Sequence, residues 1–210
     1  MTRLVLATRN RKKLVELDRI LRDAGVRVDL LTLDDVEVPE VVESGATFAE
    51  NAIIKATATA AATGIASVAD DSGLAVDALN GMPGVLSARW SGAGATDESN
   101  LVLVLEQTAD VPDDRRGASF VCVAALAEPG GEVHTVEGRV VGHLLRAPAG
   151  EGGFGYDPIF VPEGHDRTTA QMEPADKDAL SHRGQAFRGI AALLGAGGGT
   201  RTRTPEGTGS

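Results

Sequence analysis

Cysteine is nearly absent from this 210-residue sequence, and aromatic residues make up only 3% of it. The single cysteine, Cys122, excludes an intramolecular disulfide and a zinc site built from several thiolates. It lies in the apolar run 120–126, so we interpret it as a small buried hydrophobic residue. With so few aromatic residues, the core has to consist mainly of Val, Leu, Ile and Ala side chains.

Long apolar runs are absent as well. No stretch reaches the roughly 20 residues that a transmembrane helix needs. The apolar segment 4–7 is too short for a signal peptide before the charges of residues 9–13 begin. We therefore expect no membrane association and a cytoplasmic location.

Basic residues are the minority among the charged residues. The sequence has 20 Lys and Arg against 30 Asp and Glu, which gives a formal net charge of -10 at pH 7. This balance disfavours a protein whose main role is to coat nucleic acid or an anionic membrane. A hydrophobic share of 42% and a charged share of 24% are typical of a folded chain rather than a disordered one.

The pattern of apolar residues predicts one α/β domain over residues 1–194, built on a mixed, elongated sheet. Its opening is typical of a strand, a helix and a strand over 3–7, 12–24 and 26–33. Thr47 and Glu50 predict a capping box for the next helix, which ends before Gly64. The later elements are expected to be a short strand over 65–69, a helix over 100–107 and a last helix over 181–194. The turn residues 128–131 predict a hairpin of two long strands over 118–127 and 133–145. Residues 195–210 offer no apolar side chain worth burying, which predicts a disordered tail.

A basic cluster occupies the predicted turn between the first strand and the first helix. The first thirteen residues contain no acid and five basic residues: Arg3, Arg9, Arg11, Lys12 and Lys13. A helix N-terminus binds phosphate through its free N–H groups and its partial positive charge. Thr8 and Asn10 add donors there, and Lys13 adds a counter-charge. The alternative is a solvated helix start, and this segment alone leaves both interpretations open.

Two adjacent acids, Asp70 and Asp71, come directly after the predicted short strand and are followed by Ser72 and Gly73. Ligands of open α/β sheets bind at the carboxyl ends of strands, and carboxylates are ligands that Mg²⁺ prefers. Because adjacent residues project in different directions, one acid can face a site while the other braces a loop. The alternative is an Asp-rich turn, the commoner case for such a segment alone. A phosphate site nearby favours the metal, since a polyphosphate needs a divalent cation to offset its charge.

A glycine-rich loop over 150–158 contains two of the few aromatic residues, Phe154 and Tyr156. An aromatic ring presented by such a loop suits stacking on a nucleobase. The loop lacks the Gly-Lys pair of a P-loop, and it does not open a helix as a dinucleotide-binding loop does. The alternative is a plain turn with one aromatic ring in the core, and we favour base stacking.

The predicted start of the last helix carries Ser181, His182, Arg183 and Gly184, with Lys177 shortly before it. Arginine and histidine side chains there can donate hydrogen bonds to a carbonyl oxygen. The alternative is the ordinary polarity of a helix start. The other histidines have no metal-ligand spacing, and no serine elbow or Cys–His pairing indicates covalent catalysis.

Five segments occur in one order along the chain, and their sequences are TRNRKK over 8–13, TFAENAIIK over 47–55, ADDSGL over 69–74, GGFGYDP over 152–158 and SHRG over 181–184. Together they closely resemble the inosine triphosphate pyrophosphatase family, also described as dITP/XTP pyrophosphatases, over about residues 3–194. Each motif alone is weak, but five motifs in this order with fitting intervals are highly specific.

The resemblance implies an elongated mixed α/β fold with flanking helices, two lobes around a central nucleotide-binding cleft, and commonly a homodimer. It implies hydrolysis of ITP, dITP and XTP to the monophosphate and pyrophosphate with Mg²⁺, which cleanses the nucleotide pool. No nucleic-acid or membrane partner is expected.

Matched to the family's motifs, residues of this sequence take three kinds of role. Asp71 corresponds to the proton acceptor and metal ligand, and Lys55 to a lysine near the phosphates. Some members carry a second metal-ligating Glu, for which Glu43 is the candidate. The triphosphate contacts correspond to Thr8, Arg9, Asn10, Arg11, Lys12 and Lys13, and Ser72 corresponds to a further substrate contact. The nucleobase-side contacts correspond to Phe154, Gly155, Tyr156, Asp157, Lys177, His182 and Arg183.

Three other functions stay open from the sequence. A regulator could sense purine triphosphates without cleaving them, although the paired acids argue against it. A nucleic-acid-binding module could use the basic turn and the glycine-rich loop, which the net charge disfavours. A pyrophosphatase for other nucleotides, such as modified pyrimidines, is separated from the first hypothesis only by a panel of substrates.

Overall fold

The computed structural model describes residues 3–197, with the side chains of Lys12, Glu16, Leu17 and Ala196 left out of that description. The predicted tail lies mostly outside these residues, because 198–210 are not described. The last helix, α5 (His182–Gly197), continues three residues past the predicted boundary at 194.

Within the described residues, one six-stranded mixed sheet forms the centre of the molecule, in the order β2-β1-β3-β4-β5-β6. The strands are β1 (Arg3–Leu6), β2 (Asp29–Thr32), β3 (Ser67–Val76), β4 (Gly117–Ala127), β5 (Val133–Leu144) and β6 (Phe160–Pro162). β1 pairs in parallel with β2 and β3, whereas β3, β4, β5 and β6 pair antiparallel. The predicted strand-helix-strand opening and the predicted hairpin of two long strands are both confirmed.

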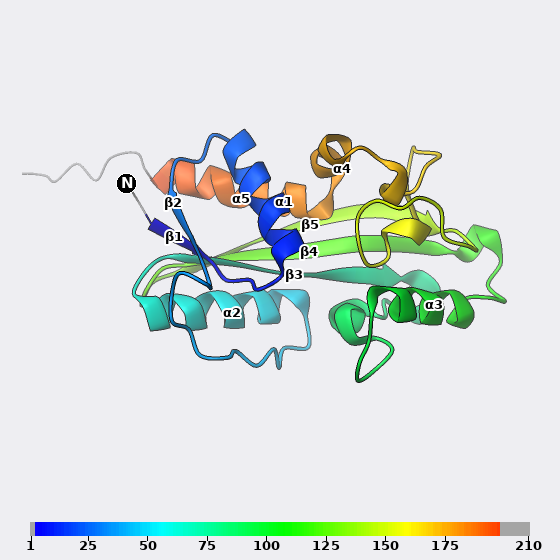
Figure 1. Ribbon diagram of the computed structural model, residues 1–210, viewed down its shortest axis with the longest axis horizontal. Helices are drawn as coiled ribbons and strands as arrows, with labels where there is room; N and C mark the ends of the chain where they lie inside the picture. The colour runs from blue at the N-terminus through cyan, green and yellow to red at the C-terminus, as the bar shows by residue number, and fades with distance from the viewer. Residues whose placement is uncertain (1–2, 198–210) are drawn as a thin grey trace, which may run out of the picture.

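Helices cover both faces of the sheet. They are α1 (Arg11–Asp23), α2 (Phe48–Thr63), α3 (Asp97–Gln107), α4 (Pro174–Leu180) and α5. The long strands β3, β4 and β5 run along the molecule, with α1, α4 and α5 on one side and α2 and α3 on the other (Figure 1). No helix in the described part of the chain has the length and apolarity to cross a bilayer. The expected elongated sheet with flanking helices is confirmed.

Small aliphatic side chains fill the core, as the shortage of aromatic residues predicts. Under α1 and α5, a cluster of buried residues includes Leu6, Val68 and the fully buried Cys122. Under α2, the contact consists mainly of alanines, such as Ala56 of the helix and Ala125 of β4. The predicted burial of Cys122 is confirmed, and its thiol also donates to Asp70 Oδ2 at 3.8 Å.

The helix α2 has the ends that the sequence predicts, with one difference. Thr47 Oγ1 accepts from the backbone N–H of Glu50 at 3.1 Å, and Gly64 closes the helix at φ 67°. The Glu50 carboxylate accepts from the N–H of Ala46, not from that of Thr47. The N-cap is therefore confirmed, but the acid binds one residue further back.

The predicted end of the third strand at residue 69 is wrong. β3 continues to Val76, and Asp70, Asp71 and Ser72 lie inside it, opposite Ala124, Val123 and Cys122 of β4. Pairing along the whole length of β4 overrides the turn preference of an Asp-Asp-Ser-Gly segment. The acids do follow the last residue of β3 that pairs with β1, which is Val68. One edge of β3 is therefore free of β1 where the acids begin.

Gly138 of β5 lets the N-terminus of α5 rest directly on the sheet. A Cβ at this position would overlap the carbonyl oxygen of His182 and come within 2.8 Å of the backbone nitrogen of Ala186. Because both atoms belong to the helix backbone, no flexible side chain can move aside. The close approach fixes where the side chains of residues 182 and 183 begin.

We expect Gly138→Ala to destabilise the protein by about 1–3 kcal/mol through overpacking. Thermal unfolding measures this loss as a lowered Tm. The control is Gly195→Ala on α5, the helix that Gly138 contacts, where a Cβ meets nothing within 4 Å. That change should leave the Tm unchanged or raise it, because alanine favours the helix. Equal Tm values for both variants would contradict the close approach at Gly138.

Candidate active site

A cavity of about 480 Å³ lies where β1 ends and β3 continues. This volume is in the range of small-molecule sites, about 300–1,000 Å³. Many elements form its wall, and they are the β1–α1 turn, the segment 33–43, α2, β3, the 3₁₀ helix Gly84–Arg89, α3, β4, the loop 154–157, α4 and α5. Elements from both ends of the molecule therefore meet around one hollow, as the predicted cleft between two lobes requires.

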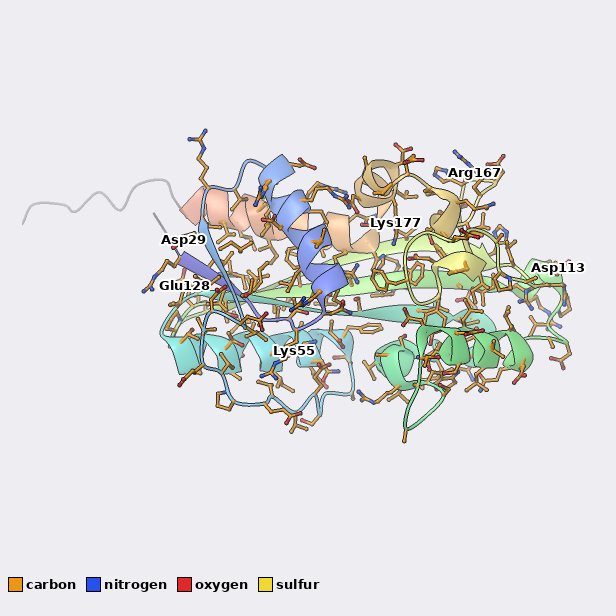
Figure 2. The ribbon with its side chains drawn as sticks, in the orientation of Figure 1. Asp29, Lys55, Asp113, Glu128, Arg167 and Lys177 are labelled. Atoms are coloured by element: carbon orange, nitrogen blue, oxygen red, sulfur yellow. The ribbon has the colours of Figure 1, made fainter. Side chains whose placement is uncertain are left out.

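Most of the predicted site residues line this cavity. They are Thr8, Arg9, Asn10, Lys13, Glu43, Lys55, Asp71, Ser72, Phe154, Gly155, Tyr156, Asp157, Lys177, His182 and Arg183. Arg11 is exposed on α1 and is not part of the wall, while the side chain of Lys12 lies outside the described residues. Lys55 and Lys177 come from opposite sides of the sheet (Figure 2).

The N-terminus of α1 forms one end of the cavity. Thr8 Oγ1 accepts from the N–H of Asn10 at 3.2 Å, and Asn10 Oδ1 accepts from the N–H of Lys13 at 3.3 Å. These bonds hold the turn and cap the helix, and Thr8, Asn10 and Lys13 all line the cavity. A helix start of this kind suits an anion such as phosphate.

Asp71 faces α2. Its carboxylate accepts from Asn51 Nδ2 at 3.2 Å and from Lys55 Nζ at 3.3 Å, and Lys55 Nζ also lies 3.4 Å from Glu43 Oε2. Burial raises the pKa of the Asp71 carboxyl, and the Lys55 ammonium partly offsets that rise. A buried carboxylate with a raised pKa is suited to accept a proton.

Asp70 faces the opposite way, toward α1 and α5, which confirms that the two acids project in different directions. Its Oδ2 atom lies 3.0 Å from Lys13 Nζ, 3.4 Å from Arg183 Nε and 3.2 Å from the Ser72 hydroxyl. Burial favours the neutral acid, but the charges of Lys13 and Arg183 outweigh it and hold the pKa of Asp70 well below its usual value. The match to the family's motifs assigned a role to Asp71 but none to Asp70, which also lines the cavity.

The glycine-rich loop forms the other end of the cavity around Asp157. This carboxylate accepts from the N–H of Phe154 and from Lys177 Nζ, both at 2.8 Å. The Phe154 ring lies 5.1 Å from Lys177 Nζ and 5.6 Å from Arg183 Cζ. Tyr156 is buried in the core, and its hydroxyl donates to the Ser87 carbonyl at 2.8 Å. Of the two rings, Phe154 is therefore the one available to a flat ligand.

His182 and Arg183 begin α5 and are both buried. The His182 ring stacks on Phe120 with centres 5.0 Å apart. Burial and the nearby charges of Arg183 and Lys177 hold the pKa of His182 well below its usual value, so its ring is neutral at pH 7. A neutral imidazole offers one donor and one acceptor.

The carboxylates that could hold a metal ion are those of Asp71 and Glu43, which lie 3.3 and 3.4 Å from Lys55 Nζ. In residues 3–197 no three His, Cys, Asp or Glu side chains gather into a metal cluster. Mg²⁺ is usually held by one or two carboxylates together with water and substrate phosphates. Two carboxylates already placed about one positive group therefore fit Mg²⁺ bound together with a nucleotide.

Comparison with known proteins decides the family. The sequence model of the Ham1 family matches residues 4–193. The chain belongs to the Ham1 family. A dITP/XTP pyrophosphatase of Nocardia farcinica is 60% identical over 198 residues, covering 93% of this chain and 96% of the relative. The family membership predicted from the five motifs is thus confirmed.

Solved structures of Ham1-family proteins have the same fold. A nucleoside-triphosphatase / dITP/XTP pyrophosphatase of Mycobacterium abscessus is 56% identical, with a TM-score of 0.75 over 92% of this chain and 99% of that structure. A HAM1 protein of Coxiella burnetii is 43% identical, with a TM-score of 0.84 over 93% of this chain and 100% of that structure. This agreement confirms the predicted fold class for the Ham1 chain.

Proposed function

We propose that this Ham1-family chain hydrolyses ITP, dITP and XTP to the monophosphate and pyrophosphate, and so removes non-standard purines from the nucleotide pool. The names of the relatives in Nocardia and Mycobacterium support this substrate class. The observation that carries the proposal is the shared hollow in which the Lys13 ammonium and the Asp71 carboxylate both form the wall. A triphosphate held at the start of α1 lies within reach of a buried carboxylate there.

In this reaction, Asp71 orients a water molecule against the α-phosphorus and accepts its proton, while pyrophosphate leaves. Lys13 and Lys55 offset the charge that develops on the phosphoryl oxygens. Asp71 and Glu43 would hold Mg²⁺, which when bound supplies further positive charge to those oxygens. The raised pKa of Asp71 supports its role as proton acceptor, because a carboxylate of higher pKa is a stronger base.

Purine selection follows from the donors at the start of α5. Hypoxanthine and xanthine carry an acceptor oxygen at position 6, whereas adenine presents an amino donor there. The Arg183 guanidinium and the His182 imidazole donate hydrogen bonds to that oxygen. The amino group of adenine would face these N–H donors and could not accept from them. Each buried group left unpaired costs about 1–3 kcal/mol. Guanine also carries the 6-oxygen, so this contact by itself does not reject GTP.

A substrate panel tests the function. Pyrophosphate release is measured with Mg²⁺ for dITP, XTP, dATP, dGTP and a modified pyrimidine triphosphate. We expect kcat/KM to be highest for dITP and XTP. A preference for the pyrimidine would support the alternative pyrophosphatase. Nucleotide binding without any release of pyrophosphate would support the regulator instead.

The homodimer and the cytoplasmic location that the sequence predicts stay predictions. The same holds for Mg²⁺ as the cofactor, which the two-carboxylate donor set supports. Pyrophosphate release that survives complete removal of divalent cations with EDTA would contradict the metal.

The neighbours of Asp71 give a two-sided prediction for its pKa. Lys55 lowers this pKa and Glu43 raises it, so Lys55→Met should raise it above the wild-type value and Glu43→Gln should lower it. The measurement is an NMR titration of the Asp71 carboxyl carbon in metal-free protein. Lys55→Arg is the control, since it keeps the positive charge beside Asp71. Shifts of the same sign in the two charge-removing variants would contradict the arrangement around Lys55.

A further inference from the structure

Four cations of the cavity wall form ion pairs with carboxylates, and they are Lys13, Lys55, Lys177 and Arg183. Lys55 pairs with Asp71, and Lys177 pairs with Asp157. Asp70 differs from Asp71 and Asp157, because it forms ion pairs with two cations that come from different helices. Lys13 belongs to α1 and Arg183 belongs to α5, 113 residues beyond Asp70 in the chain.

Asp70 lies deep in the protein. Its side chain is 1% exposed, and it projects from the long, paired strand β3. The Ser72 hydroxyl donates to Asp70 Oδ2 at 3.2 Å and accepts from Arg183 Nη2 at 2.9 Å. The guanidinium is therefore held at two points of its planar fork, by Asp70 at Nε and by Ser72 at Nη2. Lys13, by contrast, is held by a single oxygen, the one that also binds Arg183.

We propose that Asp70 is a positioning residue, which sets the phosphate-binding Lys13 and the base-reading Arg183 relative to one another from one oxygen atom. The roles of these two cations rest on the proposed function. Because Lys13 and Arg183 share this oxygen, a change at Lys13 displaces the guanidinium of Arg183 that donates to the base. Selection of the purine is then coupled to binding of the triphosphate, although Asp70 itself contacts neither the purine nor the triphosphate.

Two lysines of the phosphate end provide the test. Lys13→Met removes the cation that shares Asp70 with Arg183, whereas Lys55→Met removes a cation held by Asp71 and Glu43. The readout is the ratio of kcat/KM for dITP to kcat/KM for dATP. This ratio does not depend on how much of the protein is correctly folded, so a merely structural defect leaves it unchanged.

We expect both lysine variants to turn over dITP more slowly. Only Lys13→Met should lower the dITP-to-dATP ratio, by about 10-fold or more, because displacement of a positioning group by about 1 Å can cost up to 10²-fold. Asp70→Asn should lower the ratio in the same way, and Lys55→Met should keep the wild-type ratio. An unchanged ratio in Lys13→Met would overturn the coupling, and so would an equal fall in Lys55→Met.

A second measurement needs no catalysis. The NMR signal of the Arg183 Nε–H reports its hydrogen bond to Asp70 in nucleotide-free protein. We expect Lys13→Met to shift this signal and Lys55→Met to leave it in place, and an unshifted signal in Lys13→Met would overturn the proposal. A wild-type protein that fails to cleave any nucleotide would refute the proposed function, while this signal still decides the role of Asp70. If Asp70→Asn does not fold, Lys13→Met decides both measurements.

Discussion

Asp71→Asn is expected to keep nucleotide binding and to lower pyrophosphate release by about 10²–10⁴-fold, the usual contribution of a positioned base. The amide keeps the shape of the side chain, and its one oxygen can accept from either Asn51 or Lys55, which donate to the two carboxylate oxygens at 3.2 and 3.3 Å. It cannot accept a proton from water. The measurements are the rate of pyrophosphate release with saturating dITP and the Kd for dITP by calorimetry.

Asp77→Asn is the matched control for that variant. Asp77 follows β3 directly, is exposed, and is not part of the cavity wall. Its substitution should leave both the rate and the Kd at their wild-type values. A near-normal rate in Asp71→Asn would remove Asp71 from the mechanism. A large loss of binding with a normal maximal rate would instead make Asp71 a substrate contact.

Local sequence patterns were sufficient where the structure depends on neighbouring residues. Apolar runs, helical periodicity, a Thr47 cap and the turn at 128–131 correctly predict the opening strand-helix-strand unit, α2 and the β4–β5 hairpin. These local patterns gave the wrong end for β3, because residues 70–73 have the composition of a turn. Pairing with β4 keeps those residues in the strand, and Gly73 fits because a Cβ there would overlap the Ser87 hydroxyl. Neither β4 nor Ser87 is adjacent to residues 70–73 in the sequence.

The site shows the same division between local and long-range information. Each motif predicted residues that do line the cavity, because each motif carries its polar groups on one short segment of the chain. The role of Asp70 could not be predicted, since it depends on Lys13 and Arg183, which reach it from two separate helices. The burial of Tyr156, whose hydroxyl binds the Ser87 carbonyl, is likewise a long-range contact. The residue types indicated the chemistry of the site, whereas the fold determines which carboxylate pairs with which lysine or arginine.

Arg183→Ala is expected to lower the dITP-to-dATP ratio of kcat/KM by about 10²-fold or more, because a site that hydrogen-bonds a substrate group rejects the analogue lacking it. The guanidinium is nearly fully buried, is held by Asp70 and Ser72, and has its Cζ atom 5.6 Å from the centre of the Phe154 ring. Arg183→Lys should not restore the ratio, since an ammonium lacks the planar fork that two fixed acceptors hold. Arg188→Ala on the same helix is the control, because Arg188 donates only to carbonyls of α4 and is not part of the cavity wall. It should keep the wild-type ratio, and a wild-type ratio in Arg183→Ala would show that another group reads the base.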